Sequence, residues 1–169
     1  MLKTHLILDA ARMEKMIDLA KEINPFNTSL YRNKQDQDQI QPSVAPFLFD
    51  YPNCVDFEDL VIGKGWGNAW GIWVLSEADF ESLYRHFRRF LVVQTQDGQE
   101  LYFRFYDPRV LRVFLPTCDT DQLLDFFGPV ETFVMEDEDP SQCIIFSLWQ
   151  DQLFTDRLQV SLIRHIVGS

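Results

Sequence analysis

Residues 101–111 (LYFRFYDPRVL) constrain the fold of this chain more than any other segment. Two arginines and an aspartate interrupt a stretch that is largely aromatic and aliphatic. Because side chains alternate between the two faces of a strand, we expect three apolar residues on one face and the polar set on the other. The polar set comprises Tyr102, Arg104 and Tyr106. The segment therefore predicts a strand with one buried face and with a guanidinium between two phenols on its second face.

A sharp turn is predicted where this strand ends, at Asp107 and Pro108. Proline suits the first turn of a helix and aspartate is a favoured N-cap, so a helix should begin here. Arg104, Asp107 and Arg109 would then meet at one strand-to-helix corner. Two interpretations remain open. Either Asp107 caps the helix and pairs with one of the arginines, or the corner presents a contact surface to a partner.

The composition indicates a folded, acidic protein with one domain. The length of 169 residues and the apolar content of 46% allow a substantial core. No apolar run approaches the ~20 residues that a membrane span needs, and the N-terminus lacks the features of a signal peptide, so we expect a cytoplasmic protein. The formal net charge of −11 argues against binding to nucleic acids or anionic membranes and suits either solubility or a basic partner.

The sequence offers no motif for catalysis or for metal binding. Cys54, Cys118 and Cys143 are widely spaced and odd in number, as is typical of reduced thiols, and the histidines have no metal-ligand spacing. We therefore expect no cofactor and no metal. The glycines of residues 63–67 (GKGWG), expected to form a loop, lack a dinucleotide fingerprint, and the acidic residues 136–139 lack the pattern of a calcium loop. A hydrolase whose triad is assembled from distant residues remains an alternative.

Hydrophobic periodicity predicts strands that alternate with helices. Strands are expected over residues 5–8, 46–51, 70–75, 91–96, 100–106, 130–135 and 143–149. Helices are expected over residues 10–23, 56–62, 80–90, 108–115 and 121–127. Asp56 and Thr120 are expected to cap the second and the last of them, and Ser76 with Asp79 gives a capping-box-like start for the third. Residues 97–98 (DG) predict a hairpin turn, residues 33–42 a mobile loop, and residues 136–140 an acidic turn. Residues 152–167 fit a helix slightly better than a strand.

These elements predict an α/β fold: a single domain with a mixed β-sheet and helices packed on it. The expected helix that follows Asp79 is amphipathic, and its polar side carries Arg85, His86, Arg88 and Arg89. This basic cluster is either a solvated surface paired with carboxylates or a contact for an anion or a partner.

The strand over residues 70–75 places Trp70 on one face and Trp73 on the other. Burial is the usual position of tryptophan in a folded protein. If no helix covers the second face of this strand, an exposed aromatic patch results, and such patches mark binding surfaces. Trp70 and Trp73 are therefore candidate partner-binding residues.

Six segments, taken together and in this order, resemble an adaptor or chaperone domain that is also known as domain of unknown function 4123. They are residues 29–31 (SLY), 45–48 (APFL), 70–73 (WGIW), 83–90 (LYRHFRRF), 103–110 (FRFYDPRV) and 127–130 (FGPV). Proteins of that family are bacterial type VI secretion adaptors that load toxic effectors onto the tip protein of the injection spike. The resemblance covers roughly residues 6–135, and residues of about 140–167 would add a C-terminal hairpin strand and helix.

The resemblance implies a non-enzymatic, cytoplasmic adaptor that binds the N-terminal region of a secreted effector and the spike tip protein. Many members of the family continue well beyond the motif region, so this chain is either a compact member or lacks part of a partner surface. An immunity-type protein that binds and blocks a toxin is an alternative. The family motif falls on Arg85, His86, Arg88, Arg104, Tyr106, Asp107, Pro108 and Arg109.

Overall fold

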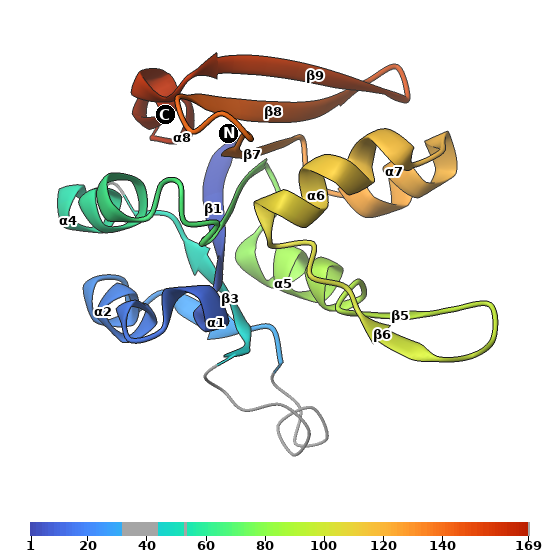
Figure 1. Cartoon of the computed structure of the whole chain (residues 1–169), viewed down its shortest axis with the longest axis horizontal. Coiled ribbons are helices and arrows are strands. Elements are labelled where there is room, and N and C mark those ends of the chain that lie inside the picture. Colours follow the sequence, from blue (N-terminus) through green and yellow to red (C-terminus); the bar gives the residue numbers. More distant parts are fainter. Residues whose placement is uncertain (32–43, 53, 169) are drawn as a thin grey trace.

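The computed structural model describes residues 1–31, 44–52 and 54–168. Within this part of the chain, a seven-stranded sheet with the order β2-β3-β1-β4-β7-β8-β9 runs through the centre of the molecule (Figure 1). Its strands are β1 (Lys3–Asp9), β2 (Asn27–Ser29), β3 (Pro46–Asp50), β4 (Gly71–Ser76), β7 (Thr132–Glu136), β8 (Gln142–Trp149) and β9 (Gln152–Gln159).

The prediction of a single α/β domain is confirmed, but the sheet is not mixed. Every pairing between its described strands is antiparallel. The physical reason is clearest at the C-terminal end, where short turns join β7 to β8 and β8 to β9, because a turn of this length can only reverse the chain. The predicted mobile loop over residues 33–42 lies outside the described residues.

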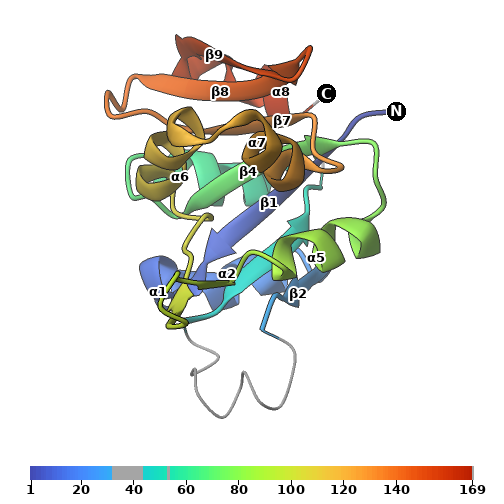
Figure 2. The ribbon, with the colours of Figure 1, turned by 90° about the vertical axis from the view of Figure 1, so that its right-hand side faces the viewer.

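Helices cover both faces of the sheet and form a three-layer arrangement (Figure 1). One layer contains α1 (Ala10–Met13), α2 (Met16–Ile23), α4 (Val55–Glu58), a π-helix (Asp59–Lys64) and α8 (Ile163–Val167). The other layer, which faces the viewer in Figure 2, contains α5 (Phe80–Arg88), α6 (Pro108–Phe114) and α7 (Thr120–Phe127).

Aromatic side chains fill the space between the sheet and both helical layers. Phe49 of β3 packs against Phe57 of α4, with ring centroids 5.6 Å apart. On the other side, Phe133 of β7 contacts Phe87 of α5 and Phe127 of α7, at 6.4 Å and 5.0 Å. Because aromatic residues bury large apolar areas, these two clusters fix the helices on the sheet.

A small hairpin stands apart from the main sheet and projects from the layer of α5 and α6 (Figure 1). Its strands are β5 (Val92–Gln94) and β6 (Glu100–Tyr102), and Gly98 adopts a φ of +83° in the predicted turn. β6 ends earlier than predicted, and residues 104–107 form a turn in which Asp107 N donates to Arg104 O at 3.0 Å. Tyr102, Arg104 and Tyr106 therefore do not share one face of a strand.

Two of the predicted helix starts are displaced. Cys54 rather than Asp56 is the N-cap of α4, and Asp119 rather than Thr120 is the N-cap of α7. Asp119 and Gln122 form a reciprocal capping box, which satisfies two backbone groups and favours this earlier start. Asp79 was expected to form a capping box with Ser76 at the start of α5, but Ser76 belongs to β4 and Asp79 itself is the N-cap, with its Oδ1 accepting a hydrogen bond from Ser82 N at 2.7 Å.

Three other segments also differ from the prediction. Residues 10–23 form two helices, because the backbone breaks at Glu14 with a φ of +53°. Residues 63–64 of the predicted glycine loop belong to the π-helix. Residues 152–167 form β9, a 3-10 turn (Val160–Leu162) and α8, because pairing with β8 stabilises a strand that its own periodicity did not indicate.

Glu136 was expected in a solvated acidic turn, yet it is buried at the end of β7. Its Oε1 accepts a hydrogen bond from Ala69 N at 2.8 Å. Burial raises the pKa of this carboxyl group above its ordinary value. The carboxylate therefore stabilises the turn before β4, where Ala69 has a φ of +53°.

Candidate partner-binding site

The predicted cap at Asp107 is present. The carboxylate is buried, and its Oδ1 accepts a hydrogen bond from Arg109 N at 3.0 Å, with Pro108 in the first turn of α6. The Arg109 guanidinium also donates to both carboxylate oxygens, from Nε to Oδ1 at 3.0 Å and from Nη2 to Oδ2 at 2.6 Å. Burial alone would raise the pKa of Asp107, but the hydrogen bonds from Arg109 outweigh it and hold the pKa below its usual range.

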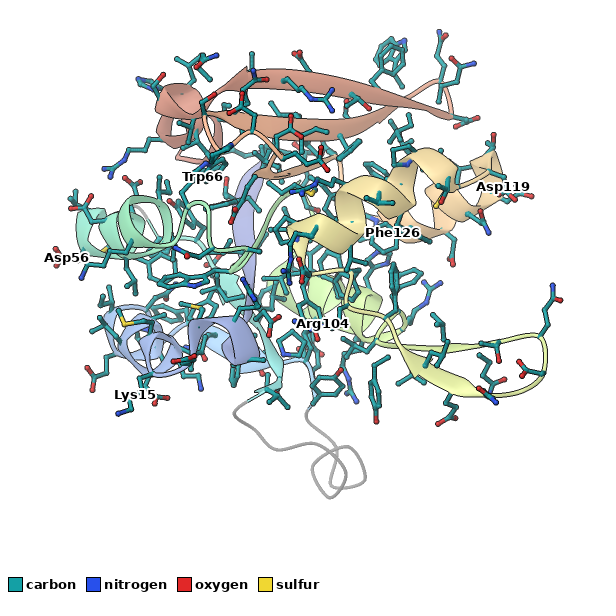
Figure 3. The ribbon with its side chains drawn as sticks, viewed as in Figure 1. Lys15, Asp56, Trp66, Arg104, Asp119 and Phe126 are labelled. Carbon is teal, nitrogen blue, oxygen red and sulfur yellow. The ribbon has the colours of Figure 1, made fainter. Side chains whose placement is uncertain are left out.

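Arg104 has a different main partner from the one that the sequence suggested. Its guanidinium donates to the carboxylate of Asp9, a fully buried residue at the end of β1, whereas its distance to Asp107 Oδ2 is 3.9 Å. Asp9 also caps α1 by accepting from Ala11 N at 3.0 Å. In the view of Figure 3, Arg104 lies below α6. The corner thus connects β1 and α1 to the start of α6.

Sequence reasoning missed Asp9. A usable signal was present, because an aspartate between a predicted strand and a predicted helix is a typical N-cap. Its ion pair with Arg104 was not accessible to sequence reasoning, since the two residues are separated by 95 positions.

A shallow groove lies beside the corner and is called the tyrosine groove here. Its volume is about 340 Å³, and it is lined mainly by Asp9, Tyr31, Tyr102, Arg104 and Tyr106. Tyr106 is buried, and burial, with a further contribution from the nearby charge of Asp9, raises its pKa to about 12. Three phenols and a guanidinium can form polar contacts with a partner, but the phenol of Tyr106 stays protonated at neutral pH.

His86 does not lie on the polar side of α5, contrary to the prediction. It is buried, and its Nε2 lies 2.8 Å from Phe126 O, to which the neutral ring donates a hydrogen bond. The ring also packs over Gly128, which ends α7 with a φ of +48°. Position 86 borders the apolar stripe because it precedes Phe90 by four residues, and its ring contacts that of Phe90 at 5.1 Å. His86 therefore connects α5 to α7.

Acid is expected to weaken the fold through His86. Burial lowers the pKa of this ring, outweighing the hydrogen bond to Phe126 O that acts in the opposite direction. The unfolded chain, with a histidine pKa of about 6.5, therefore binds the proton first, and stability is lost as the pH falls from there toward the folded pKa. Urea unfolding measures the free energy of unfolding at pH 7.5 and pH 5.5. Between these pH values it should fall less for His86→Gln than for the unchanged chain. The same pH dependence in both proteins would contradict this role.

The three arginines at the C-terminal end of α5, of which Arg89 is the C-cap, have partners on the protein itself. Arg89 Nη2 lies 2.5 Å from Asp125 Oδ1, and this pair connects α5 to α7 at the surface. The Arg88 guanidinium lies over the ring of Tyr84, at 5.4 Å from its centroid, and Arg85 is 3.8 Å from a glutamate one turn earlier. Exposed pairs of this kind contribute little to stability, so all three side chains remain able to exchange partners.

An apolar groove lies on the other side of the hairpin and is called the aromatic groove here. Its volume is about 430 Å³, and it lies between the hairpin, the C-terminal end of α5, α6 and α7. Phe126 is central to it, with ring contacts to Phe90 at 5.0 Å and to Phe114 at 5.8 Å (Figure 3). Its apolar lining is Phe90, Val93, Phe103, Phe114 and Phe126, and its polar lining is Gln122 and Asp125.

The hairpin separates the two grooves and is apolar on both faces. Val92 pairs with Tyr102 and Val93 with Leu101, and each of these side chains is 38–50% exposed. The side chains of the two pairs lie on opposite faces of the hairpin. Val93 therefore lines the aromatic groove and Tyr102 lines the tyrosine groove. A two-stranded hairpin with exposed apolar residues on both faces suits a contact surface better than a structural element.

The two candidate tryptophans do not form an exposed patch. Trp73 is buried in the core and packs on Trp66, with ring centroids 5.8 Å apart, while Trp70 is half-buried. Trp66 donates from Nε1 to Pro140 O at 2.8 Å. The expectation of a binding patch on β4 is wrong for Trp73, because the turn after the π-helix covers this face of the sheet.

Residues 1–31, 44–52 and 54–168 contain no group of three or more histidine, cysteine or acidic residues arranged to hold a metal ion. In the same ranges, no helix has the length and apolar character required to cross a membrane. All three cysteines are free thiols, and burial raises the pKa of Cys118 and Cys143.

Comparison with known proteins gave one match. A family model described as a domain of unknown function (DUF4123) matches residues 4–124. This range contains the corner, the hairpin and most of both grooves, and it leaves β7, β8, β9 and α8 outside. Neither the curated proteins nor the solved structures gave a match.

Proposed function

The chain belongs to the DUF4123 family, and on that premise we propose that it is a non-enzymatic adaptor of bacterial type VI secretion. It binds the N-terminal region of a cognate effector and passes the effector to the tip protein of the spike. The observation that carries this proposal is the aromatic groove beside the exposed hairpin. The hairpin and five of the seven residues that line the groove lie within residues 4–124, the range that the family model matches, and Asp125 and Phe126 follow directly after it.

The aromatic groove has the composition of a protein interface. Phenylalanines form its centre, while Gln122 and the ion pair of Arg89 with Asp125 lie at its margin. Interfaces are typically apolar at the centre and polar at the rim, and a few aromatic residues supply most of the binding energy. A volume of about 430 Å³ accommodates a few apolar side chains of an effector segment. The net charge of −11 favours a segment that is also basic.

The corner supports this groove instead of forming it. Phe103 lines the groove next to Arg104, and Phe114 lines it at the end of α6, the helix that Asp107 caps. The ion pair of Arg104 with Asp9 therefore fixes one side of the groove relative to β1, and the ion pair of Arg109 with Asp107 stabilises the start of α6. In this proposal the motif of residues 103–110 marks the family because it positions the binding surface.

Replacing Val93 and Leu101 together with aspartate is expected to weaken effector binding about tenfold or more. Both side chains are exposed, so the change places charge on the apolar hairpin without altering the core. The measurement is calorimetric titration of each variant with the effector encoded beside this gene, and co-purification with the neighbouring spike tip protein.

Val55→Asp is the matched control, because Val55 is 66% exposed on α4, on the opposite face of the sheet. It should bind the effector like the unchanged chain. Equal binding by all three proteins would show that the hairpin is not the contact. If the unchanged chain retains neither neighbouring protein, the adaptor function itself is refuted.

An immunity-type protein that blocks a toxin is the second candidate, favoured by the same acidity and the same groove. Inhibition distinguishes the two. A purified adaptor should leave the activity of the bound effector intact, whereas an immunity protein should abolish it at a stoichiometric ratio.

A further inference from the structure

The last strand of the sheet has a free edge. Among the strands that the structure describes, β9 pairs only with β8, and it is eight residues long. The hairpin of β8 and β9 forms one end of the molecule, far from α2 (Figures 1 and 2). This element lies outside residues 4–124, so the family match does not account for it.

The register of the hydrogen bonds shows which backbone groups face outward. At the end of the ladder, Val160 N donates to Ser141 O at 2.9 Å. Because hydrogen-bonded pairs alternate along an antiparallel ladder, the backbone N–H and C=O groups of the even-numbered residues of β9 point toward β8. The backbone N–H and C=O groups of the odd-numbered residues, including Leu153 and Thr155, point outward from the free edge of the sheet. Consistent with this, Arg157 N donates to Asp156 Oδ1 at 2.8 Å and not to a strand.

The side chains on one face of β9 alternate between apolar and acidic. Phe154, Asp156 and Leu158 share this face, and Trp149 of β8 lies on it as well. Phe154 is 50% exposed and Trp149 is 66% exposed. Aromatic residues pair well with β-branched residues across strands, and opposite charges also pair well. The complementary strand therefore carries an apolar residue, a basic residue and another apolar residue at every second position.

Charge favours a partner of this kind over a second copy of the chain. Residues 137–159 contain five carboxylates and one arginine. That arginine, Arg157, lies on the other face, where its Nε is 2.6 Å from Asp137 Oδ2. Two copies would bring equal acidic edges together, whereas a basic segment neutralises the edge.

We propose that β9 is a docking edge, to which a partner polypeptide adds an extended segment of the pattern apolar–x–basic–x–apolar. Main-chain hydrogen bonds to the outward groups of Leu153 and Thr155 provide affinity, and contacts with Phe154 and Asp156 provide selectivity. Asp156 has two roles. It attracts the basic residue, and its hydrogen bond to Arg157 N limits pairing with uncharged strands. This proposal is independent of the aromatic groove.

The test uses the full chain and the acetylated, amidated peptide Thr-Val-Thr-Lys-Thr-Val-Thr, whose pattern reads the same in both directions. Saturable binding should shift the amide resonances of residues 152–159. Thr155→Pro should weaken binding about tenfold or more, because it removes an outward donor while leaving the ladder to β8 intact. Thr155→Val keeps the donor and should bind like the unchanged chain.

Four results would overturn the proposal. The first two are that the peptide does not bind at millimolar concentration, or that the Thr155→Pro and Thr155→Val chains bind it equally. The third is that a peptide with glutamate in place of lysine binds equally well. The fourth is that the chain forms a dimer that Thr155→Pro dissociates. The chain with Val93→Asp and Leu101→Asp must retain peptide binding. Loss of peptide binding in that variant would place the peptide in the aromatic groove and reject the β9 edge. Neither retention nor loss of peptide binding bears on effector binding.

Discussion

Asp9→Ala is expected to lower the free energy of unfolding by about 3 kcal/mol. The carboxylate is fully buried, caps α1 through Ala11 N and accepts the guanidinium of Arg104. Alanine removes the cap and leaves the buried end of Arg104 without its main acceptor. This loss of stability is at the lower end of the range for removing one partner of a buried ion pair. Arg104 is 44% exposed, so water solvates the exposed part of its guanidinium. Urea unfolding with an unchanged m-value would measure it.

Asp9→Asn separates the two roles of this residue. Asparagine is as good an N-cap as aspartate but carries no charge, so about half of the loss should be recovered. A loss below about 1 kcal/mol for Asp9→Ala would contradict the structural interpretation of the corner. Arg104 would then be available to a partner, and the tyrosine groove would become the better candidate for the effector contact.

Local signals in the sequence predicted those parts of the fold that depend on neighbouring residues. The cap at Asp107 follows from a side chain that bonds a backbone group two positions away, and the start of α5 after Asp79 follows from one that bonds a group three positions away, although Ser76 takes no part in that cap. The hairpin turn at Gly98 follows from a φ that glycine adopts without strain. These features need no information about the rest of the chain, and the structure contains all of them.

Features that depend on distant residues could not be predicted in the same way. The pairing of Arg104 with Asp9 and the burial of His86 against Phe126 O arise only when separate elements pack together. The segment that contains β9 fits a helix slightly better than a strand, because Leu158, Leu162 and Ile166 recur at the helical period, and only pairing with β8 decides its conformation. The aromatic groove belongs to this class as well, since its lining comes from four elements that meet only in the folded chain.

Gly128→Ala is expected to destabilise the fold by about 3 kcal/mol, for two physical reasons. A Cβ at this position would lie 2.4 Å from Cε1 of His86, well inside the contact distance. The backbone at Gly128 also has a φ of +48° and a ψ of −112°, a conformation that alanine adopts only with strain. Thermal and urea unfolding of the purified variant would measure the loss.

A double-mutant cycle with His86→Ala separates the two contributions, because it removes the ring that the new methyl group meets. His86→Ala alone loses the hydrogen bond to Phe126 O, but in the Gly128→Ala background it also relieves the clash. The double variant should therefore be more stable than the sum of the single losses predicts, by about 1–2 kcal/mol. Simple additivity would mean that backbone strain at Gly128 accounts for the whole effect. Coupling would instead show that the contact of His86 with Gly128 holds α5 against α7, and Phe126 of α7 and Phe90, which directly follows α5, line the aromatic groove.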